Sequence, residues 1–346
     1  MRRVGGWRQW LALGVLMGTC VSGFPGTAYA YGPGSGEGDQ PTGPSGNSDG
    51  KGNISATAGA VVYDLSNNGS GASTGAVTPT TTWTPPACYY APKYSPDALE
   101  AYLTPIWEAD STGYEWDATQ RDRYVNGKPY KDFNKDKAGK GYWWDSYVTP
   151  GREGDPGALD CTKPIFWVDT GDKPPADVPQ AVTPEILSQL AYNQIRVPST
   201  KVTLAPADKT KVNLPTWAWL DGAEFKPVSV TASVPVLGIS ATTTARPYSL
   251  KIDPGTSDAV TYPASGVCEF RNGSIGEAYA KGKAGETPPC GVKYLHSSGT
   301  GSYPLKATIT WKISWKGTGT PGGPLDDGVF GATQDVIVQE IQSVNR

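Results

Sequence analysis

The chain has 346 residues, including 43 glycines and 31 prolines, and its formal net charge is −3 at pH 7. This content of glycine and proline argues against a helix-rich fold, because both residue types interrupt helices. A net charge close to zero argues against a nucleic-acid partner held by a basic surface. Composition therefore indicates a β-rich protein whose interactions do not depend on strong overall charge.

Residues 1–30 have the three regions of a secretory signal peptide. Arginines at positions 2, 3 and 8 precede an apolar run from Leu11 to Val21, and Ala28, Tyr29 and Ala30 follow it as a small-residue cleavage site. The run is shorter than the roughly 20 residues that span a bilayer, and no apolar pair follows the first arginines as in a twin-arginine signal. We expect cleavage after Ala30 and a mature chain without a transmembrane segment. The predicted location is extracellular, either free or associated with the cell wall.

The cysteines left after removal of the signal peptide are Cys88, Cys161, Cys268 and Cys290. An even number of cysteines in an exported chain indicates disulfides, and four cysteines allow three pairings. We favour Cys88 with Cys161 and Cys268 with Cys290, because each pair then lies within one predicted domain. A zinc site is the alternative, and the absence of C-x-x-C spacing argues against it.

Residues 31–82 are rich in Gly, Ser, Pro and Thr, with AVVYDL as an apolar island. Such a segment buries too little apolar surface to offset its ordering entropy, so we predict a flexible spacer.

Residues 83–175 are dense in Trp and Tyr and are predicted to form a small module that depends on its disulfide. Ser95 and Pro96 begin a helix that Pro105 kinks or ends, and the remainder is predicted as loops and short strands.

A proline-rich joint at 171–180 leads into a domain over 176–346. Thr183 caps a helix that has Pro184 at its first position and an apolar stripe at i, i+3 and i+4 spacing. Alternating or apolar segments separated by Gly and Pro turns predict strands at 200–206, 214–221, 228–236, 247–253, 259–263, 303–315 and 335–341. We therefore predict a mainly β fold, with an antiparallel β-sandwich of immunoglobulin-like or polycystic-kidney-disease-like type and one packed helix.

A resemblance to known proteins rests on the segments VTPEILSQLAYNQIRVPSTKVTLAP, NLPTWAWLD, YPASGVCEF, PPCGVKYLHSSGTGSYPLKATITWKISWKG and GVFGATQDVIVQEIQ. Through them, residues 183–346 resemble a group of secreted actinobacterial proteins without an established activity. The resemblance implies export and an envelope setting, and no particular chemistry. Because neither G-x-G-x-x-G nor G-x-x-x-x-G-K-[ST] occurs in the required context, no nucleotide cofactor is predicted.

His296 is the only histidine of the chain, so a Ser-His-Asp mechanism would have to use it. Neighbouring side chains of an extended segment point to opposite faces, which places Ser297 poorly as its partner. The chain also lacks a G-x-S-x-G nucleophile elbow. We predict a histidine in a loop or at a strand end, without a catalytic role.

A metal site is not predicted, because one imidazole cannot build the usual three-ligand zinc site. Asp132, Asn134 and Asp136 copy the first ligands of a calcium loop. However, Lys137 and Trp143 stand where that loop needs its glycine and its bidentate glutamate. A charged surface turn is the preferred interpretation.

The aromatic module places carboxylates among tryptophans, which is the setting of a glycoside hydrolase. The residues are Glu108, Asp110, Glu115, Asp117 and Asp145 among Trp107, Trp116, Trp143 and Trp144. No spacing marks an acid and a nucleophile. Trp143 and Trp144 are adjacent, so an extended segment is expected to bury one and expose the other to a sugar ring. These two and Trp116 are the candidate ligand-binding residues.

We predict a secreted, non-enzymatic envelope or extracellular protein that binds a partner protein or a cell-wall glycan. The alternative is a secreted hydrolase that uses carboxylates of the aromatic module on cell-wall or other polysaccharide. An exposed apolar or aromatic patch favours the first function, and a cleft with two carboxylates about 5 to 10 Å apart favours the second. The sequence does not predict the oligomeric state.

Overall fold

The computed structural model describes residues 60–70, 74–109, 112–198, 201–207, 209–220, 225–271 and 273–341, and the backbone of strands at 45–48 and 54–58. The signal peptide predicted at 1–30 and the beginning of the predicted spacer lie outside these residues. Among the helices that are described, none is long and apolar enough to cross a membrane.

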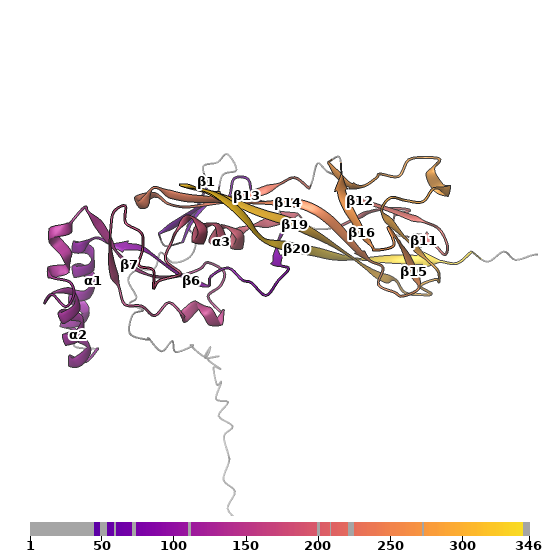
Figure 1. Ribbon diagram of the computed structural model, residues 1–346. Coiled ribbons are helices and arrows are strands. Elements are labelled where there is room, and N and C mark those ends of the chain that lie inside the picture. Colours follow the sequence, from indigo (N-terminus) through magenta and orange to yellow (C-terminus); the bar gives the residue numbers. More distant parts are fainter. Residues whose placement is uncertain are drawn as a thin grey trace, which may run out of the picture.

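The described chain is mainly β, with a few helices between its strands (Figure 1). The strands are β1 (Ser45–Ser48), β2 (Ile54–Ala58), β3 (Val61–Asp64), β4 (Thr74–Ala76), β5 (Thr78–Pro79), β6 (Cys88–Tyr94), β7 (Gly141–Val148), β8 (Phe166–Asp169), β9 (Arg196–Pro198), β10 (Thr203–Ala205), β11 (Lys209–Lys211), β12 (Thr216–Leu220), β13 (Val228–Val234), β14 (Ile239–Asp253), β15 (Ala259–Tyr262), β16 (Val267–Arg271), β17 (Ser274–Gly276), β18 (Gly291–Tyr294), β19 (Tyr303–Gly317) and β20 (Thr320–Gln339). The α-helices are α1 (Pro96–Glu108), α2 (Tyr114–Tyr124) and α3 (Pro184–Gln194), and the short 3-10 helices are η1 (Asp132–Lys137), η2 (Pro156–Leu159), η3 (Pro235–Leu237) and η4 (Lys283–Gly285). The predicted mainly β fold is confirmed.

One sheet of 15 strands forms the body of the protein. Along its main path the order is β1-β2-β3-β13-β14-β16-β17-β12-β18-β15, and β19 pairs with both β14 and β20. Within the described residues every pairing of this sheet is antiparallel apart from that of β11 with β20. Short hairpin turns between successive strands favour this antiparallel arrangement.

Three long strands, β14, β19 and β20, run along the body of the protein (Figure 1). On β19 the odd-numbered residues of the central part are buried, and the even-numbered residues are half-buried or exposed. The buried set consists of Leu305, Ala307, Ile309, Trp311 and Ile313. This period of two fixes which face of the strand meets the core. The strand predicted at 303–315 is therefore confirmed, with its register.

Helix α3 packs on β13, β14 and β19. The Thr183 hydroxyl accepts a hydrogen bond from the Ile186 backbone N–H, and Pro184 is the first helical residue, as predicted. The apolar stripe of the helix is buried against the sheet, and the Thr243 hydroxyl of β14 donates to the Ser188 carbonyl over 2.7 Å. The predicted helix is confirmed, and it covers one half of the long strands.

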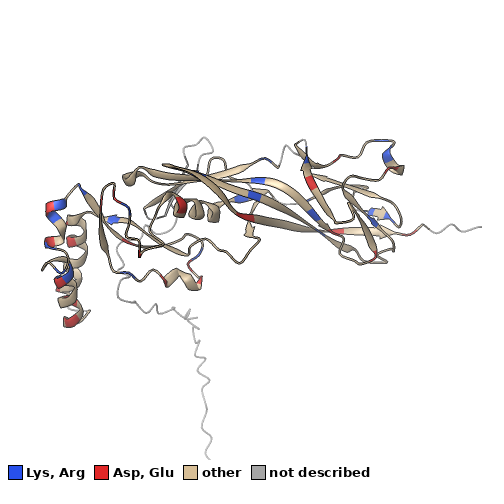
Figure 2. Ribbon diagram, viewed as in Figure 1, with Lys and Arg blue, Asp and Glu red and all other residues tan. Residues whose placement is uncertain are grey.

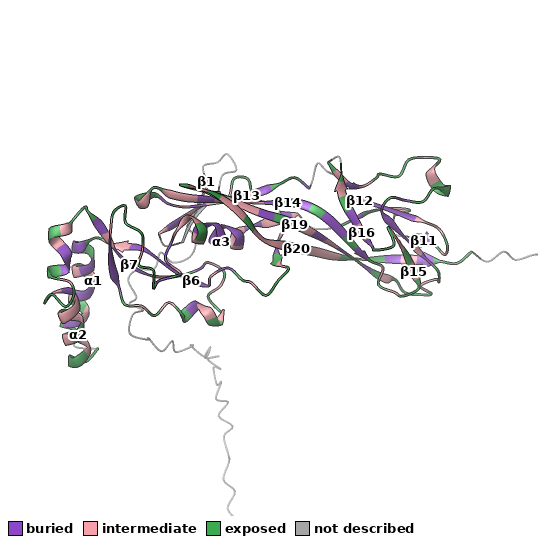
Figure 3. Cartoon of the chain, in the orientation of Figure 1, coloured by how far each residue is buried: buried purple, intermediate pink, exposed green. Residues whose placement is uncertain are grey.

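A second layer of strands covers the other half of β14, β19 and β20, and Figure 3 shows buried residues along both layers. Strand β16 connects the layers, because it pairs with β14 on one side and with β17 on the other. The Cys268–Cys290 disulfide links β16 to the residue before β18. Tyr294 of β18 stacks on Tyr303 of β19, with ring centroids 5.2 Å apart. These two layers are the predicted sandwich, and the favoured cysteine pairing is present.

Residues 60–82 are not a spacer, contrary to the prediction for 31–82. Strand β3, within the island AVVYDL, pairs with β13, and its Val61 and Tyr63 are buried in the main core. Strand β4 pairs with β9, β5 pairs with β20, and Val77 between β4 and β5 is buried. Composition missed these strands because sheet pairing uses backbone groups, which polar and small residues supply as well as apolar ones.

The aromatic module is built on a separate sheet of order β6-β7-β8. The Cys88–Cys161 disulfide closes it, which is the pairing favoured from the sequence. One face of the sheet packs under α1, α2 and Phe133, and the other face belongs to the main core. The module is therefore covered on both sides, and this decides the environment of its tryptophans.

Helix α1 continues past Pro105 to Glu108, although the sequence predicts a kink or an end at this proline. Trp107 in the last turn is buried and packs on Phe133, with ring centroids 5.9 Å apart. Tertiary packing of this kind contributes more to helix stability than local propensity does. The contact with Phe133 therefore holds the turn that Pro105 weakens.

Helix α2 was not predicted, because it has hardly any apolar face and its N-cap residue, Gly113, has no side chain to cap it. Its sequence nevertheless carries a helix signal in its charges. Acidic residues occupy the first turn and basic residues the last: Glu115, Asp117, Arg121 and Arg123. This order complements the helix dipole, and it is the feature that would have identified the helix.

Candidate functional site

Trp143 and Trp144 are both buried, with 0% and 2% of their surface exposed, so the prediction that one of them is exposed is wrong. They belong to the cores on opposite faces of β7, as an extended strand requires. Trp143 packs against Trp167 at 5.3 Å, and its Nε1–H donates to the Phe133 carbonyl over 3.0 Å. Trp116, the third candidate, is half-buried beside the same cluster. The module therefore offers neither Trp143 nor Trp144 to a sugar ring.

His296 lies just after β18, at the strand end predicted for it, and its side chain is 64% exposed. Its Nδ1 is 3.9 Å from Asp258 Oδ2. The Ser298 hydroxyl makes other bonds: it donates to the Gly301 carbonyl over 2.8 Å and accepts from the Val338 N–H over 3.1 Å. The structure therefore gives the histidine an acidic neighbour, and it gives Ser298 a structural role in the loop.

Replacing His296 with alanine is expected to change the free energy of unfolding by less than about 0.5 kcal/mol, because exposed ion pairs contribute little. Ser298→Ala is the comparison variant, and it should cost about 1 kcal/mol because a hydrogen-bonded loop hydroxyl is lost. Urea denaturation of both variants and of the wild type measures the difference. A larger loss for His296→Ala than for Ser298→Ala would contradict the surface role of the histidine.

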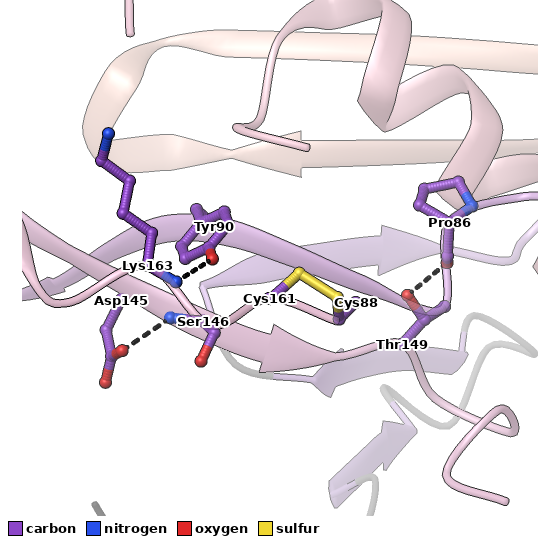
Figure 4. Close-up of a disulfide and its surroundings, with 8 residues drawn as sticks. All are labelled: Pro86, Cys88, Tyr90, Asp145, Ser146, Thr149, Cys161 and Lys163. Carbon is purple, nitrogen blue, oxygen red and sulfur yellow. Dashed lines mark hydrogen bonds between the residues drawn. A yellow bond between two sulfur atoms is a disulfide. The ribbon is translucent and has the colours of Figure 1, made fainter. Parts of the chain in front are cut away.

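Asp145, a carboxylate of the aromatic module, is held in a buried ion pair. Its side chain is 2% exposed, and one oxygen lies 2.9 Å from Lys93 Nζ. The other oxygen accepts the Ser146 backbone N–H over 2.7 Å (Figure 4). Burial, with the Asp145 charge adding to it, raises the pKa of the Tyr147 hydroxyl above its usual range. This closed arrangement stabilises the strand pair β6–β7 and does not present an acid to a substrate.

The other predicted carboxylates are also unsuited to a shared site. Glu108 and Glu115 are exposed, and the buried Asp117 accepts a hydrogen bond from the Thr112 hydroxyl over 2.5 Å. Asp110 lies outside the described residues. Of the carboxylates that are described, none predicted from the module lines the groove that we consider next.

A groove of about 940 Å³ lies between the aromatic module and the sandwich domain. One wall is the segment 171–186, which leads from the end of the module into the first turn of α3. The opposite wall consists of Leu237 and Ile239 at the β13–β14 turn, and of Trp315 with Thr318–Thr320 at the β19–β20 turn. Trp144 also contributes to the lining. Segments far apart in the sequence therefore meet here.

The first wall is fixed to strand β6. The Tyr90 N–H donates to the Gln180 carbonyl over 3.1 Å, and the Val182 N–H donates to the Tyr90 carbonyl over 2.9 Å. The Tyr90 hydroxyl accepts the Lys163 N–H over 2.7 Å beside the Cys88–Cys161 disulfide (Figure 4). Prolines restrict the backbone of this wall further. The joint predicted at 171–180 is thus an ordered wall that belongs to neither helix nor sheet.

The second wall is held by bonds between two hairpin ends. The Thr318 N–H donates to the Ser240 carbonyl over 2.9 Å, and the Ser240 N–H donates to the Thr318 hydroxyl over 2.9 Å. Gly317 allows the two walls to touch, because a Cβ at this position would lie only 2.8 Å from Pro184 Cβ. The groove is therefore closed where α3 begins.

The lining combines apolar carbon with a few charges. Prolines, Ile186 and Trp315 supply the apolar surface, and Asp172, Lys173 and Glu185 supply the charges. Glu185 lies in the first turn of α3, where the helix N-terminus stabilises a negative charge. A concave, mostly apolar surface with few polar groups is typical of a binding site.

No protein-family model matches the chain, and neither a curated protein nor a solved structure matches it. The resemblance of residues 183–346 to secreted actinobacterial proteins therefore stays a prediction. What the structure itself defines is a disulfide-bonded, mainly β protein with a groove between an aromatic module and a sandwich domain.

Proposed function

We propose that this protein is a secreted, non-enzymatic envelope or extracellular protein that binds a partner protein in the groove, with a cell-wall glycan as the second ligand class. Export is supported by the signal-like residues 1–30 and by two disulfides, which are typical of proteins that fold in oxidising compartments. The observation that carries the binding function is the groove itself.

The lining of the groove favours a peptide segment over a sugar. Its walls present proline rings, Ile186 and the half-buried Trp315, and apolar side chains of a partner would displace water from these surfaces. The charges of Lys173 and Glu185 would orient that partner. Tryptophan is a common centre of protein interfaces, and Trp315 is the tryptophan that the groove offers to a partner.

The hydrolase alternative has less support. Asp145 is already held by Lys93 and Ser146, and it does not line the groove. Asp172 and Glu185 do line the groove, but their side chains are exposed. The acid of a glycosidase instead lies in an apolar pocket that keeps it protonated.

The test is to block the groove without touching the core. Ala176 is exposed and lines the groove, so Ala176→Trp fills it with an indole ring. Ala280→Trp is the matched control, because Ala280 is exposed and lies outside the lining. Affinity capture from the envelope fraction should yield one abundant partner with the wild type and with Ala280→Trp. We expect at least about tenfold less of it with Ala176→Trp, since a blocked interface centre costs more than 1 kcal/mol.

A photo-crosslinker at position 173 should attach to that same partner, which locates the binding in the groove. Equal capture by Ala176→Trp and by the wild type would contradict the proposed site. Release of soluble sugars from purified cell wall, lost in the Asp172→Asn and Glu185→Gln double variant, would overturn the non-enzymatic proposal and establish a hydrolase.

A further inference from the structure

The exposed side of β14 and β19 carries cations next to an exposed tyrosine. We call Arg246, Tyr248, Lys312 and Lys316 the cationic face. Arg246 and Lys312 are direct cross-strand partners, and Lys316 lies opposite Thr242 further along the same ladder. Figure 2 shows basic residues recurring along the long central strands. Because directly opposed residues share a face of the sheet, these side chains form one surface.

A β-bulge lies at Tyr248, the exposed tyrosine of this surface. The register of β14 with β19 shifts between Pro247 and Ser249, so Tyr248 is the extra residue. Tyr248 continues the outward, even-numbered side of β14 after Arg246 and is 52% exposed, whereas Ser249 and Leu250 are both buried. Its ring centroid lies 4.9 Å from Lys312 Nζ. Bulges redirect single side chains and are over-represented next to functional sites.

The charges of this surface are only partly balanced. Lys312 Nζ lies 2.6 Å from Asp327 Oδ2, but Arg246 and Lys316 form no ion pair with any described carboxylate. Arg246 Nη1 reaches the Ser314 hydroxyl at 3.4 Å instead. Like charges directly opposite each other destabilise a strand pair. Asp327 offsets this repulsion at Lys312, whereas the charges of Arg246 and Lys316 are left for a bound anion to neutralise.

This positive surface belongs to a protein that is acidic overall, with a net charge of −3 and an isoelectric point near 5.4. The cationic face is therefore a local arrangement and not the result of a basic composition. Thr242, Thr244 and Ser314 lie on the same ladder and add hydroxyl groups that can donate to an oxygen-rich ligand. A flat sheet face suits a long polymer better than a small molecule, which needs a concave pocket.

We propose that the cationic face binds a linear acidic glycan. Carboxylate or phosphate groups of the glycan pair with Arg246 and Lys316, and one sugar ring lies on Tyr248. The guanidinium of Arg246 can bind such an anion with two parallel hydrogen bonds, and the tyrosine ring offers a flat apolar surface to sugar C–H groups. Lys312 and Lys316 are about 13 Å apart along an extended strand, so the ligand carries anionic groups on more than one sugar.

This second ligand surface is separate from the groove and goes beyond the proposed function. A nucleic acid also carries regular negative charge. The disulfides of this fold, however, are typical of extracellular proteins, which meet acidic polysaccharides. We therefore favour the glycan, and the experiment includes duplex DNA as a competitor.

Binding of the mature protein, residues 31–346, is measured with alginate as a carboxylate polymer, poly(glycerol phosphate) teichoic acid as a phosphate polymer and dextran as a neutral one. Arg246→Gln with Lys316→Gln should weaken binding to an acidic polymer at least about tenfold, because charge-assisted bonds are lost. Lys209→Gln with Lys281→Gln changes the net charge equally at exposed positions away from the cationic face, and it should change affinity less than about twofold. Tyr248→Ala should weaken binding about fivefold, and added salt should weaken it for the wild type.

Binding to alginate alone or to teichoic acid alone supports the proposal and identifies the anionic group. Equal affinity of Arg246→Gln/Lys316→Gln and the wild type would overturn it, as would dextran binding of equal strength or tighter binding to duplex DNA. Failure of the wild type to bind either acidic polymer also overturns it, and it leaves the groove proposal standing if partner capture persists. Thermal melting checks that each variant is folded.

Discussion

A variant with both Cys88 and Cys161 replaced by alanine should lose about 4 kcal/mol of its free energy of unfolding. The disulfide joins residues separated by 73 positions, and in the loop-entropy model the stabilisation grows with the length of the closed loop. This loop contains α1, α2 and β7, so the whole aromatic module depends on it. Guanidinium denaturation followed by tryptophan fluorescence measures the loss, because Trp143 and Trp144 are buried in the folded module.

The control is the corresponding double alanine variant of Cys268 and Cys290. This bridge spans 22 positions, for which the same model predicts about 3 kcal/mol. The first variant should therefore be the less stable of the two. If it is instead the more stable, loop entropy does not govern these bridges, and packing around the sulfurs becomes the explanation to examine.

Replacing Lys93 with methionine should destabilise the protein by about 3 to 5 kcal/mol, because the substitution leaves the Asp145 carboxylate buried without a cation. The Lys93 and Asp145 side chains are 14% and 2% exposed, so water cannot take over the role of the ammonium group. Lys93 Nζ also lies 5.5 Å and 5.1 Å from the ring centroids of Tyr94 and Tyr147, and these contacts disappear with the charge. Urea denaturation at neutral pH measures the loss.

A double variant, Lys93→Met with Asp145→Leu, should recover much of this stability, since an apolar pair can replace a buried ion pair of similar volume. Lys128→Met is the matched control. Lys128 pairs with Asp122 at 3.0 Å, but the two side chains are 73% and 45% exposed, so the free energy of unfolding should hardly change. A single Lys93 variant as stable as this control would show that Asp145 is solvated, and would reopen the module as a catalytic site.

Local sequence patterns correctly predicted the strands and helices that have one face on the core and the other in water. The alternation of Leu305, Ile309 and Trp311 identified β19 with its register, and Thr183 with Pro184 identified the start of α3. Such signals are sufficient because one face of the element meets the core and the other meets water. The disulfide pairing was also predictable, because each pair joins cysteines of one structural unit.

Local patterns could not predict that both faces of the β6-β7-β8 sheet are covered by other parts of the protein. The sequence places Trp143 and Trp144 on opposite faces of a strand, but it does not say that both faces are covered. In the same way, the turn cluster at 317–324 hid the beginning of β20 at Thr320, because Gly322 adopts a positive φ of 74° inside the strand. Glycine allows such a backbone conformation without ending the strand.

The groove could not be predicted from the sequence either, because its walls come from segments that are far apart along the chain. Its walls come from segments 171–186 and 315–320, and they meet because Gly317 permits a close approach to Pro184. The joint was identified as proline-rich, and only the hydrogen bonds between Tyr90 and Gln180 or Val182 turn it into a wall. Contacts of this kind join residues whose separation along the chain carries no periodic signal.

The long strands also determine how the protein responds to bending. Strands β14 and β19 pass from the half covered by α3 into the half covered by the second layer, and β20 follows β19 through most of its length. At about 3.3 Å per residue, a strand as long as β20 extends over roughly 65 Å. Within the residues that the structure describes, the two halves share these continuous strands, so bending one half against the other would have to break their ladder of backbone hydrogen bonds. We therefore expect the body to resist bending and to hold the groove away from the far end formed by β15 and β18.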